Sequence, residues 1–347
     1  MPFLNSAGRG GVSLTRRERV IKSLDHCQPD KVPYHLEFTA PAREKLARWC
    51  GDSGFEKSLG SCLLVLSTET TGSGREVRPN VWEDQFGVEW DRSIDTDIGN
   101  VCNRPITKEN LAAYPFPDPD DPSRFSDYRR LIAAEKELFV VANLGFSLFE
   151  RAWTLAGMEE VLMAMASYSD FVHSLLDRIL QFNLRIIANT CAFPIDAMLF
   201  GDDWGHQGGI IMGPDLWREF IKPCIRQMYA LAKSKGRRAF IHSCGKVDAL
   251  LPDLIECGLD CFNPFQPEVM DVLEMKRKYG DSLSFYGGIS TQKTLPFGTV
   301  GQVKDEVRRL IDHVGKEGGY IASPAHAVPK DAKPENVAAM IEALQEQ

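Results

Sequence analysis

A histidine and a cysteine stand two positions apart at the end of an apolar stretch, in the segment FIHSCGKV at 240–247. On a β-strand, side chains two positions apart point to the same side, so His242 and Cys244 could reach one point. An imidazole nitrogen and a thiolate sulfur are ligands that Zn²⁺ takes in tetrahedral sites. Three interpretations stay open for the pair: two metal ligands, a cysteine nucleophile activated by the histidine, or two buried core residues.

Other polar residues follow short apolar segments, where they could bind substrate, transfer a proton or orient a metal ligand. They are Glu37, Asp202, Asp203, Trp204, His206, Asn263, Tyr286 and His326. Asp202 and Asp203 are neighbours on a predicted strand, whose successive side chains point to opposite faces. At most one of these carboxylates is therefore expected to enter a pocket directly, and the other to cap a helix or face solvent.

From residue 138 onward, short apolar segments alternate with longer amphipathic ones. The apolar segments predict strands and the amphipathic segments predict helices. The predicted strands are 138–144, 197–203, 238–244, 260–265, 283–288 and 318–324, and the predicted helices are 167–191, 213–236, 247–258, 269–281, 299–316 and 333–344. Such alternation predicts a parallel sheet that is covered by helices.

The upstream part of the chain has room for three more strand–helix units. Thr15 and Glu18 form a predicted capping box before a helix, and 34–38 (YHLEF) alternates as a first strand does. Residues 51–137 give no clear pattern beyond a proline-rich surface loop. These features favour an α/β fold of the (β/α)8 TIM-barrel type over an open doubly wound sheet, for which no glycine-rich phosphate turn is evident.

We expect a single barrel domain over 1–347, with an N-terminal helical extension and a flexible lead-in at 1–12. In such a barrel the carboxyl ends of the strands meet at one face, where catalytic groups collect. Its last strand lies beside its first, which makes His326 the best third candidate ligand for a zinc at His242 and Cys244. Cys257 and Cys261 flank the start of a strand and are expected at the opposite face.

Bulk composition narrows the class of protein further. The net charge of −8 argues against a nucleic-acid surface as the main binding site. No apolar run approaches the roughly 18–20 residues that cross a bilayer, and the N-terminus lacks the apolar core of a signal peptide. Nine cysteines, an odd number without a framework, indicate reduced thiols and a cytoplasmic location.

Five stretches of the chain resemble the uroporphyrinogen decarboxylase superfamily, which also contains cobalamin-dependent methyltransferases. They are LTRRERVIKSLDHCQPDKVP, ANLGFSLFERAWTLAGMEEVL, FGDDWG, HSCGKV and YIASPAHAVPKDAKPENV. The resemblance implies an eightfold barrel with a pocket at its mouth, and it raises a homodimer as one expectation. The decarboxylases carry two arginines after the first strand that meet substrate carboxylates. Here Glu37 and Phe38 replace the first arginine and Arg43 is displaced by one position from the second, which weakens the decarboxylase interpretation.

The methyltransferase branch of the superfamily holds zinc with H-x-C on one strand and a third cysteine after the last strand. His242 and Cys244 match the first two ligands, and His326 stands in the place of the cysteine. Because the decarboxylases also have a histidine in this loop, His326 does not discriminate between the branches. The resemblance therefore implies Zn²⁺ held by His242, Cys244 and His326, with a corrinoid as a second cofactor.

The resulting expectation is a zinc-dependent methyltransferase. It would move a methyl group between a small methylated substrate, or a thiol or folate acceptor, and a corrinoid carried by a partner protein. Asp202 and Glu37 would be catalytic, and the substrate would contact Asp203, Trp204, His206, Asn263 and Tyr286. Two alternatives remain: a metal-free decarboxylase of a uroporphyrinogen-like or smaller acid, with Asp202 transferring the proton and His326 binding a carboxylate, and a barrel that binds a corrinoid without catalysis.

Overall fold

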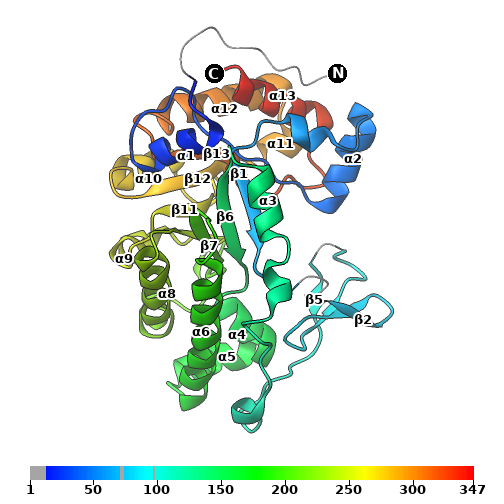
Figure 1. The fold of residues 1–347 in the computed structure, drawn as a ribbon, viewed down its shortest axis with the longest axis vertical. Coiled ribbons are helices and arrows are strands. Elements are labelled where there is room, and N and C mark those ends of the chain that lie inside the picture. The colour runs from blue at the N-terminus through cyan, green and yellow to red at the C-terminus, as the bar shows by residue number, and fades with distance from the viewer. Residues whose placement is uncertain (1–12, 71–73, 97) are drawn as a thin grey trace. The chain divides into compact units, whose positions relative to one another are not determined.

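The computed structural model describes residues 13–70, 74–96 and 98–347, so the predicted lead-in at 1–12 lies outside the described residues. The chain divides into two compact units. Figure 1 shows its helices and strands, coloured by residue number. Unit 1 consists of 1–64, 135–139 and 260–347, and unit 2 consists of 65–134 and 140–259. Whether the two units behave as the single expected domain stays a prediction.

Unit 2 is built on parallel strands that are buried along nearly their whole length. They are β6 (Phe139–Leu144), which begins at the unit boundary, β7 (Ala197–Gly201) and β10 (Arg238–His242). Ala142 pairs with Met198 in β7, and His242 of β10 pairs with Gly201. Continuous burial of short strands is what a parallel sheet covered on both faces requires, so the strands predicted here are confirmed.

The helices of unit 2 follow their strands in the expected alternation. They are α3 (Tyr128–Ala134), α4 (Phe149–Ala156), α5 (Met158–Ala166), α6 (Asp170–Thr190), α7 (Pro214–Leu216), α8 (Lys222–Ser234) and α9 (Leu251–Glu256). The helix predicted at 213–236 is interrupted, because a π-helical turn at Trp217–Ile221 separates α7 from α8. Pro223 lacks an N–H group and cannot donate to the preceding turn, so an uninterrupted α-helical ladder is impossible there.

An antiparallel sheet in unit 2 accounts for much of the region that gave no sequence pattern. Its strands run in the order β2 (Arg75–Arg78), β3 (Val81–Glu83), β4 (Glu89–Asp91) and β5 (Asn100–Val101). Trp82 faces Trp90 across the β3–β4 pair. The strands are only two to four residues long, too short for alternation to be recognised in the sequence. β1 (Leu63–Ser67) crosses the unit boundary.

Unit 1 contains a second set of parallel strands, β11 (Cys261–Phe265), β12 (Ser284–Ile289) and β13 (Tyr320–Pro324), which are also wholly buried. Its helices are α1 (Arg16–Leu24), α2 (Ala40–Cys50), α10 (Val272–Tyr279), α11 (Thr294–Phe297), α12 (Val300–His313) and α13 (Pro334–Gln345). The capping box predicted at the start of α1 is confirmed, since Thr15 and Glu18 each accept from the other's backbone N–H.

The predicted first strand at 34–38 is present only as isolated bridges. Tyr34 and Phe38 each form a parallel bridge, to Ala322 of β13 and to Val328 beyond it. The parallel direction is the one a barrel needs, but two bridges are not a strand. The α/β class with parallel strands and alternating helices is thus established, and closure into a complete eight-stranded barrel is not.

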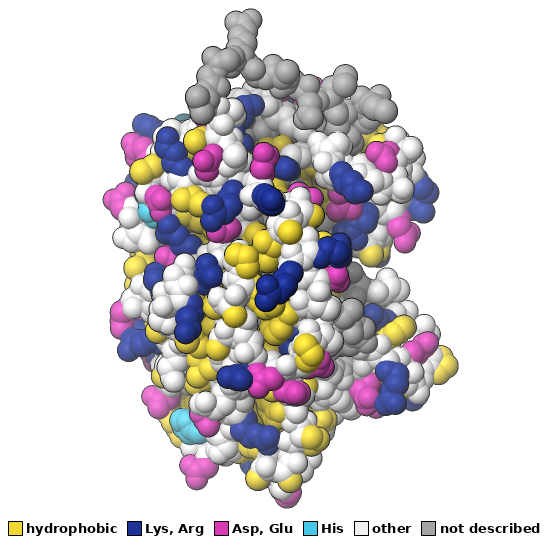
Figure 2. All heavy atoms as spheres, in the orientation of Figure 1, with side chains coloured by type: hydrophobic (Ala, Val, Ile, Leu, Met, Phe, Trp, Pro, Cys, Tyr) yellow, Lys and Arg dark blue, Asp and Glu magenta, His cyan; other side chains and the backbone are white. Residues whose placement is uncertain are grey.

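Charged side chains on the face drawn in Figure 2 are mixed in sign. Lys and Arg lie among Asp and Glu, and hydrophobic side chains are scattered between them. A field that steers a polyanion requires charges of one sign to gather. On this face of the protein they do not gather.

Candidate functional site

The ends of β7 and β10 are joined by hydrogen bonds that continue past both strands. The Asp202 N–H donates to the His242 carbonyl (2.9 Å), and the Trp204 N–H donates to Ser243 Oγ (3.1 Å). The Cys244 N–H donates to Asp203 Oδ1 (2.8 Å). The residues that follow the two strands therefore hold one another in place, and this edge of unit 2 carries the His-x-Cys pair.

A close backbone contact explains the glycine that ends the HSCG segment. Gly245 has a φ of +87°, in the left-handed region, and its α-carbon faces the backbone of Gly205 so closely that a Cβ atom would overlap it. The Lys246 N–H then donates to the His206 carbonyl (2.9 Å). The loops after β7 and β10 are thus packed backbone against backbone.

His242 and Cys244 point to the same side of β10, as their spacing predicts. Cys244 Sγ lies 3.4 Å from His242 Nε2, and both side chains are half-buried. Two ligands of one tetrahedral zinc, with a Zn–N bond of about 2.05 Å and a Zn–S bond of about 2.3 Å, would stand ~3.6 Å apart. The pair therefore fits two of the coordination positions of a single metal ion.

The electrostatic surroundings of Cys244 favour a cation. Burial raises the pKa of the Cys244 thiol well above its usual range, and the nearby carboxylates of Asp203 and Glu150 raise it further. Without a metal this thiol is protonated and unreactive, because the thiolate is the nucleophile and the ligand. A divalent ion would reverse that balance by stabilising the thiolate.

Glu150, in the first turn of α4, is a site residue that sequence reasoning missed. Burial, followed by repulsion from Asp203 and Asp202, raises the pKa of Glu150 to about 9. Its carboxyl group is therefore neutral near pH 7 and able to donate a proton or a hydrogen bond. The signal was available, because Glu150 follows the predicted strand 138–144 in the same way that the other candidates follow theirs.

Asp202 is fully buried at the N-terminus of α4. Its carboxylate accepts from the backbone N–H groups of Leu148 (3.1 Å), Phe149 (3.1 Å) and Glu150 (2.8 Å), and from the Trp204 indole N–H. Burial raises the pKa of Asp202 to about 6, and these donors oppose the rise. Of the two adjacent aspartates, Asp202 is thus the one that caps a helix, because it accepts the backbone N–H groups at the start of α4.

Trp204 and His206 follow Asp203 along the same loop. Trp204 is fully buried and packs edge-on against Trp217, with ring centroids 5.1 Å apart. His206 lies in the β8–β9 hairpin (Gly205–His206 and Gly209–Ile210), is exposed, and accepts the Gly208 N–H on Nδ1 (3.1 Å). Their contact with substrate stays a prediction.

The remaining candidates belong to unit 1. The Asn263 side-chain N–H donates to the Tyr286 carbonyl (3.0 Å), and both residues are buried. Glu37 is exposed and its Oε1 lies 3.4 Å from His35 Nε2. The His35 ring meets that of Tyr286 edge-on. His326 follows β13 and is exposed. Its participation in a metal site with His242 and Cys244 stays a prediction.

None of the helices in the described part of the chain combines the length and the hydropathy that crossing a bilayer requires.

The chain belongs to the uroporphyrinogen decarboxylase (URO-D) family, whose model matches residues 84–347. Within that family it is similar to a protein of Methanosarcina barkeri named methylcobamide:CoM methyltransferase MtaA, with 29% identity over 137 residues that cover 39% of this chain and 38% of the relative. It is also similar to a uroporphyrinogen decarboxylase of Neisseria meningitidis serogroup C, with 24% identity over 185 residues, covering 52% of this chain and 50% of the relative. The chain thus spans half or less of the length of these two relatives.

Among solved structures, a methyltransferase from Methanosarcina mazei matches over 96% of this chain and 99% of its own, with a TM-score of 0.72 and 17% identity. At that identity the match establishes the fold, which is that of a URO-D-like α/β protein. The relatives are methyltransferases and decarboxylases, and both classes are enzymes.

Proposed function

We propose that the protein is a zinc-dependent methyltransferase that exchanges a methyl group between a corrinoid carried by a partner protein and a small molecule. The small molecule is either a methylated donor or a thiol or folate acceptor. The observation that carries the proposal is the 3.4 Å separation of Cys244 Sγ and His242 Nε2, which suits one zinc ion. The likeness to a protein named methylcobamide:CoM methyltransferase supports the methyl chemistry and the corrinoid.

The proposed zinc ligands are His242, Cys244 and His326, with one position left for the small molecule. A bound zinc would supply Lewis acidity, which lowers the pKa of a thiol or polarises the atom that loses its methyl group. Asp203 fixes the backbone of Cys244 by accepting its N–H, which orients one ligand. Glu150, neutral at pH 7, is placed to hold or return a proton beside Asp203.

The two proposed catalytic carboxylates differ in what they can do. Asp202 accepts four donors, so it acts on the reaction by holding the start of α4, and with it Glu150, in position. Glu37 is exposed beside His35 and can reach a ligand directly. We therefore propose a positioning role for Asp202 and a substrate-facing role for Glu37.

The decarboxylase alternative has less support from the side chains. Arg43 is the arginine nearest the position where the decarboxylases bind a substrate carboxylate. Its guanidinium donates to Glu56 Oε1 (2.5 Å) within unit 1, and is therefore already paired with a carboxylate. Incubation with uroporphyrinogen, with detection of released carbon dioxide, tests the decarboxylase alternative directly. Turnover of any substrate would exclude the other alternative, a barrel that binds a corrinoid without catalysis.

Metal analysis of the purified protein tests the proposal. We expect about one zinc per chain, which is lost in Cys244→Ala and retained in Cys224→Ala. Cys224 is the matched control because it is a half-buried cysteine of the same unit, and its thiol donates to the Phe220 carbonyl. His326→Ala should weaken zinc binding by about tenfold or more. Demethylation of methylcobalamin by a thiol should follow the zinc content. Equal zinc and equal activity in the Cys244 and Cys224 variants would contradict the proposal.

A further inference from the structure

Unit 2 contains a small pocket at the ends of β1 and β6, lined by residues to which no role has yet been given. The Thr68 N–H donates to the Asn143 carbonyl (3.1 Å), which aligns the two strand ends. Glu69 follows β1, and Leu144, Gly145 and Phe146 end β6 and lead into α4. The pocket therefore opens at the carboxyl ends of parallel strands, where ligands of α/β proteins bind.

A buried arginine lies at the inner end of this pocket. Arg124 is only 3% exposed, and its Nε donates to the Asp118 carbonyl (3.0 Å) and its Nη1 to the Thr68 carbonyl (3.3 Å). Its Nη2 is buried and has no hydrogen-bond partner among the described residues. Within those residues no carboxylate lies at ion-pair distance from the guanidinium. A buried cation whose N–H group is unsatisfied is costly, and an anionic ligand would remove that cost.

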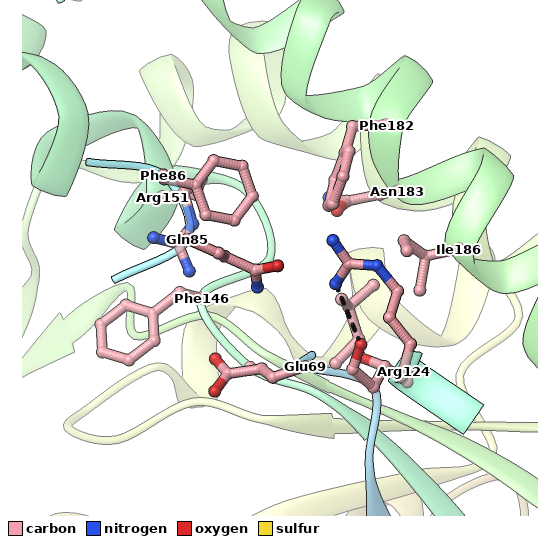
Figure 3. A pocket seen from close by; sticks show the side chains of 12 residues that line it. Glu69, Gln85, Phe86, Arg124, Phe146, Arg151, Phe182, Asn183 and Ile186 are labelled. Carbon is pink, nitrogen blue, oxygen red and sulfur yellow. Dashed lines mark hydrogen bonds between the residues drawn. The ribbon is translucent and has the colours of Figure 1, made fainter. Parts of the chain in front are cut away.

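The side chains around Arg124 are suited to a carboxylate attached to an apolar body. Figure 3 shows the Arg124 guanidinium and the Gln85 amide facing the same free space. Phe86, Phe146 and Phe182 surround that space, and Phe182 also lies under the guanidinium, with the carbon of the cation 5.4 Å from the ring centroid. Aromatic rings pack against an aromatic or aliphatic body while N–H donors fix the charged end.

A second arginine at this pocket is already neutralised. Arg151 Nη1 lies 3.1 Å from Asp84 Oδ2, and its guanidinium carbon lies 4.0 Å from the centroid of the Phe86 ring. Arg124, by contrast, has no carboxylate at ion-pair distance among the described residues, and the charges of Asp121, Asp118 and Glu69 act on it from farther away. Glu69 stands at the rim and is exposed, so its repulsion of an anion is screened by solvent. The free space is about 10 Å³, which holds one water-sized group, so one carboxylate oxygen can occupy it while the rest of the ligand lies outside it against the rings that line it.

We propose that this pocket binds the carboxylate of a small organic acid, with Arg124 as its cationic partner and the phenylalanines packing against its apolar body. If the proposed methyltransferase function holds, the acid is the methyl donor or acceptor. Carboxylate binding itself does not depend on that function.

Benzoate is a suitable probe, with benzamide as its neutral counterpart of the same shape. We expect benzoate to raise the Tm of the full chain and to bind in calorimetry, and benzamide to bind about tenfold more weakly or worse. Arg124→Gln should lose benzoate binding by a similar factor. Arg129→Gln, which removes an exposed arginine five residues further along the chain, should bind as the wild type does.

Two further variants, Gln85→Glu and Cys244→Ala, test the pocket independently of Arg124 and of the zinc site. If Arg124→Gln does not fold, Gln85→Glu provides the test, because a carboxylate at this half-buried position is screened less than the exposed Glu69 and should repel benzoate. Cys244→Ala should bind benzoate normally, so failure of the zinc proposal and failure of the acid pocket give different results. Benzoate that does not bind, or that binds the wild type, Arg124→Gln and Gln85→Glu equally, overturns the inference.

Discussion

In unit 2, Asp202 and Asp203 behind the His-x-Cys pair are bonded to backbone N–H groups, whereas two of the polar candidates of unit 1 lie at the surface. Asp202 holds three backbone N–H groups and an indole, and Asp203 holds the N–H of Cys244. Glu37 and His326, by contrast, are exposed. Groups fixed by backbone bonds provide preorganised geometry, and exposed groups can adjust to a ligand. The contrast predicts that Asp202 and its backbone partners contribute more to stability than Glu37 does.

The largest effect should come from Asp202→Ala. Removing this carboxylate leaves four buried donors without an acceptor, and we expect a loss of about 3–5 kcal/mol in the free energy of unfolding. Urea denaturation followed by circular dichroism measures it. Asp215→Ala, at a side chain that is 94% exposed, is the control and should change little. A loss below about 1 kcal/mol for Asp202→Ala would break the contrast between the units.

Gly245→Ala should rank second, with a loss of about 2 kcal/mol or more. A Cβ atom at this positive φ would also overlap the backbone of Gly205. Gly236→Ala is a matched control, because Gly236 has a φ of +71° with nothing near the added atom, and strain alone should cost it about 1 kcal/mol. Equal losses in the two variants would mean that the contact between the loops contributes nothing. Thermal or urea unfolding separates the cases.

The pH dependence of stability should reveal Glu150. Its pKa is raised to about 9 in the folded protein, above the unfolded value near 4.5, so the folded state holds the extra proton between these limits. The penalty for ionising Glu150 is absent below pH 4.5, and it grows as the pH rises toward 9, with a slope of at most about 1.4 kcal/mol per pH unit. Glu150→Gln should flatten this decline in metal-free protein.

Glu219→Gln, at an exposed glutamate of the same unit, serves as the control and should keep the slope of the wild type. The measurement is the urea midpoint between pH 5 and pH 9 after treatment with a chelator. An unchanged slope in Glu150→Gln would mean that Glu150 titrates at its ordinary pH and is not the neutral group beside Asp203.

The smallest effect should come from Glu37→Gln in unit 1. Its contact with His35 is at the surface, and we expect a change of about 1 kcal/mol or less in unfolding free energy. If Glu37→Gln destabilised the protein as much as Asp202→Ala, the polar groups of unit 1 would be as firmly held as those of unit 2. Equilibrium urea denaturation of both variants under one condition makes the comparison.

The sequence predicted those features that depend on local periodicity. Alternation along β10 placed His242 and Cys244 on one side, and the capping box at Thr15 marked the start of α1. The buried strands of both units were recognised because continuous short apolar runs are typical of parallel sheets. A regular first strand was predicted at 34–38, and the structure has only two isolated bridges there.

The features that were missed depend on contacts between distant segments. Nothing local to Asp202 shows that its carboxylate caps a helix that starts more than fifty residues earlier. Glu150 has its raised pKa because the fold buries it and because Asp203 and Asp202 lie beside it. The β2–β5 sheet consists of strands too short to show a period, and the unsatisfied N–H of Arg124 is a property of packing. Residue types predict which groups can do chemistry, and long-range packing decides which of them are available.

The contact between Gly205 and Gly245 has a consequence for redesign of the protein. With no side chain between the two peptides, the loops after β7 and β10 have no room for a larger residue at either glycine. Changes in substrate range would therefore have to come from side chains at the rim or from the other strand ends. Gly205 and Gly245 therefore fix the backbone at this edge, and substitutions are better tolerated elsewhere in the protein.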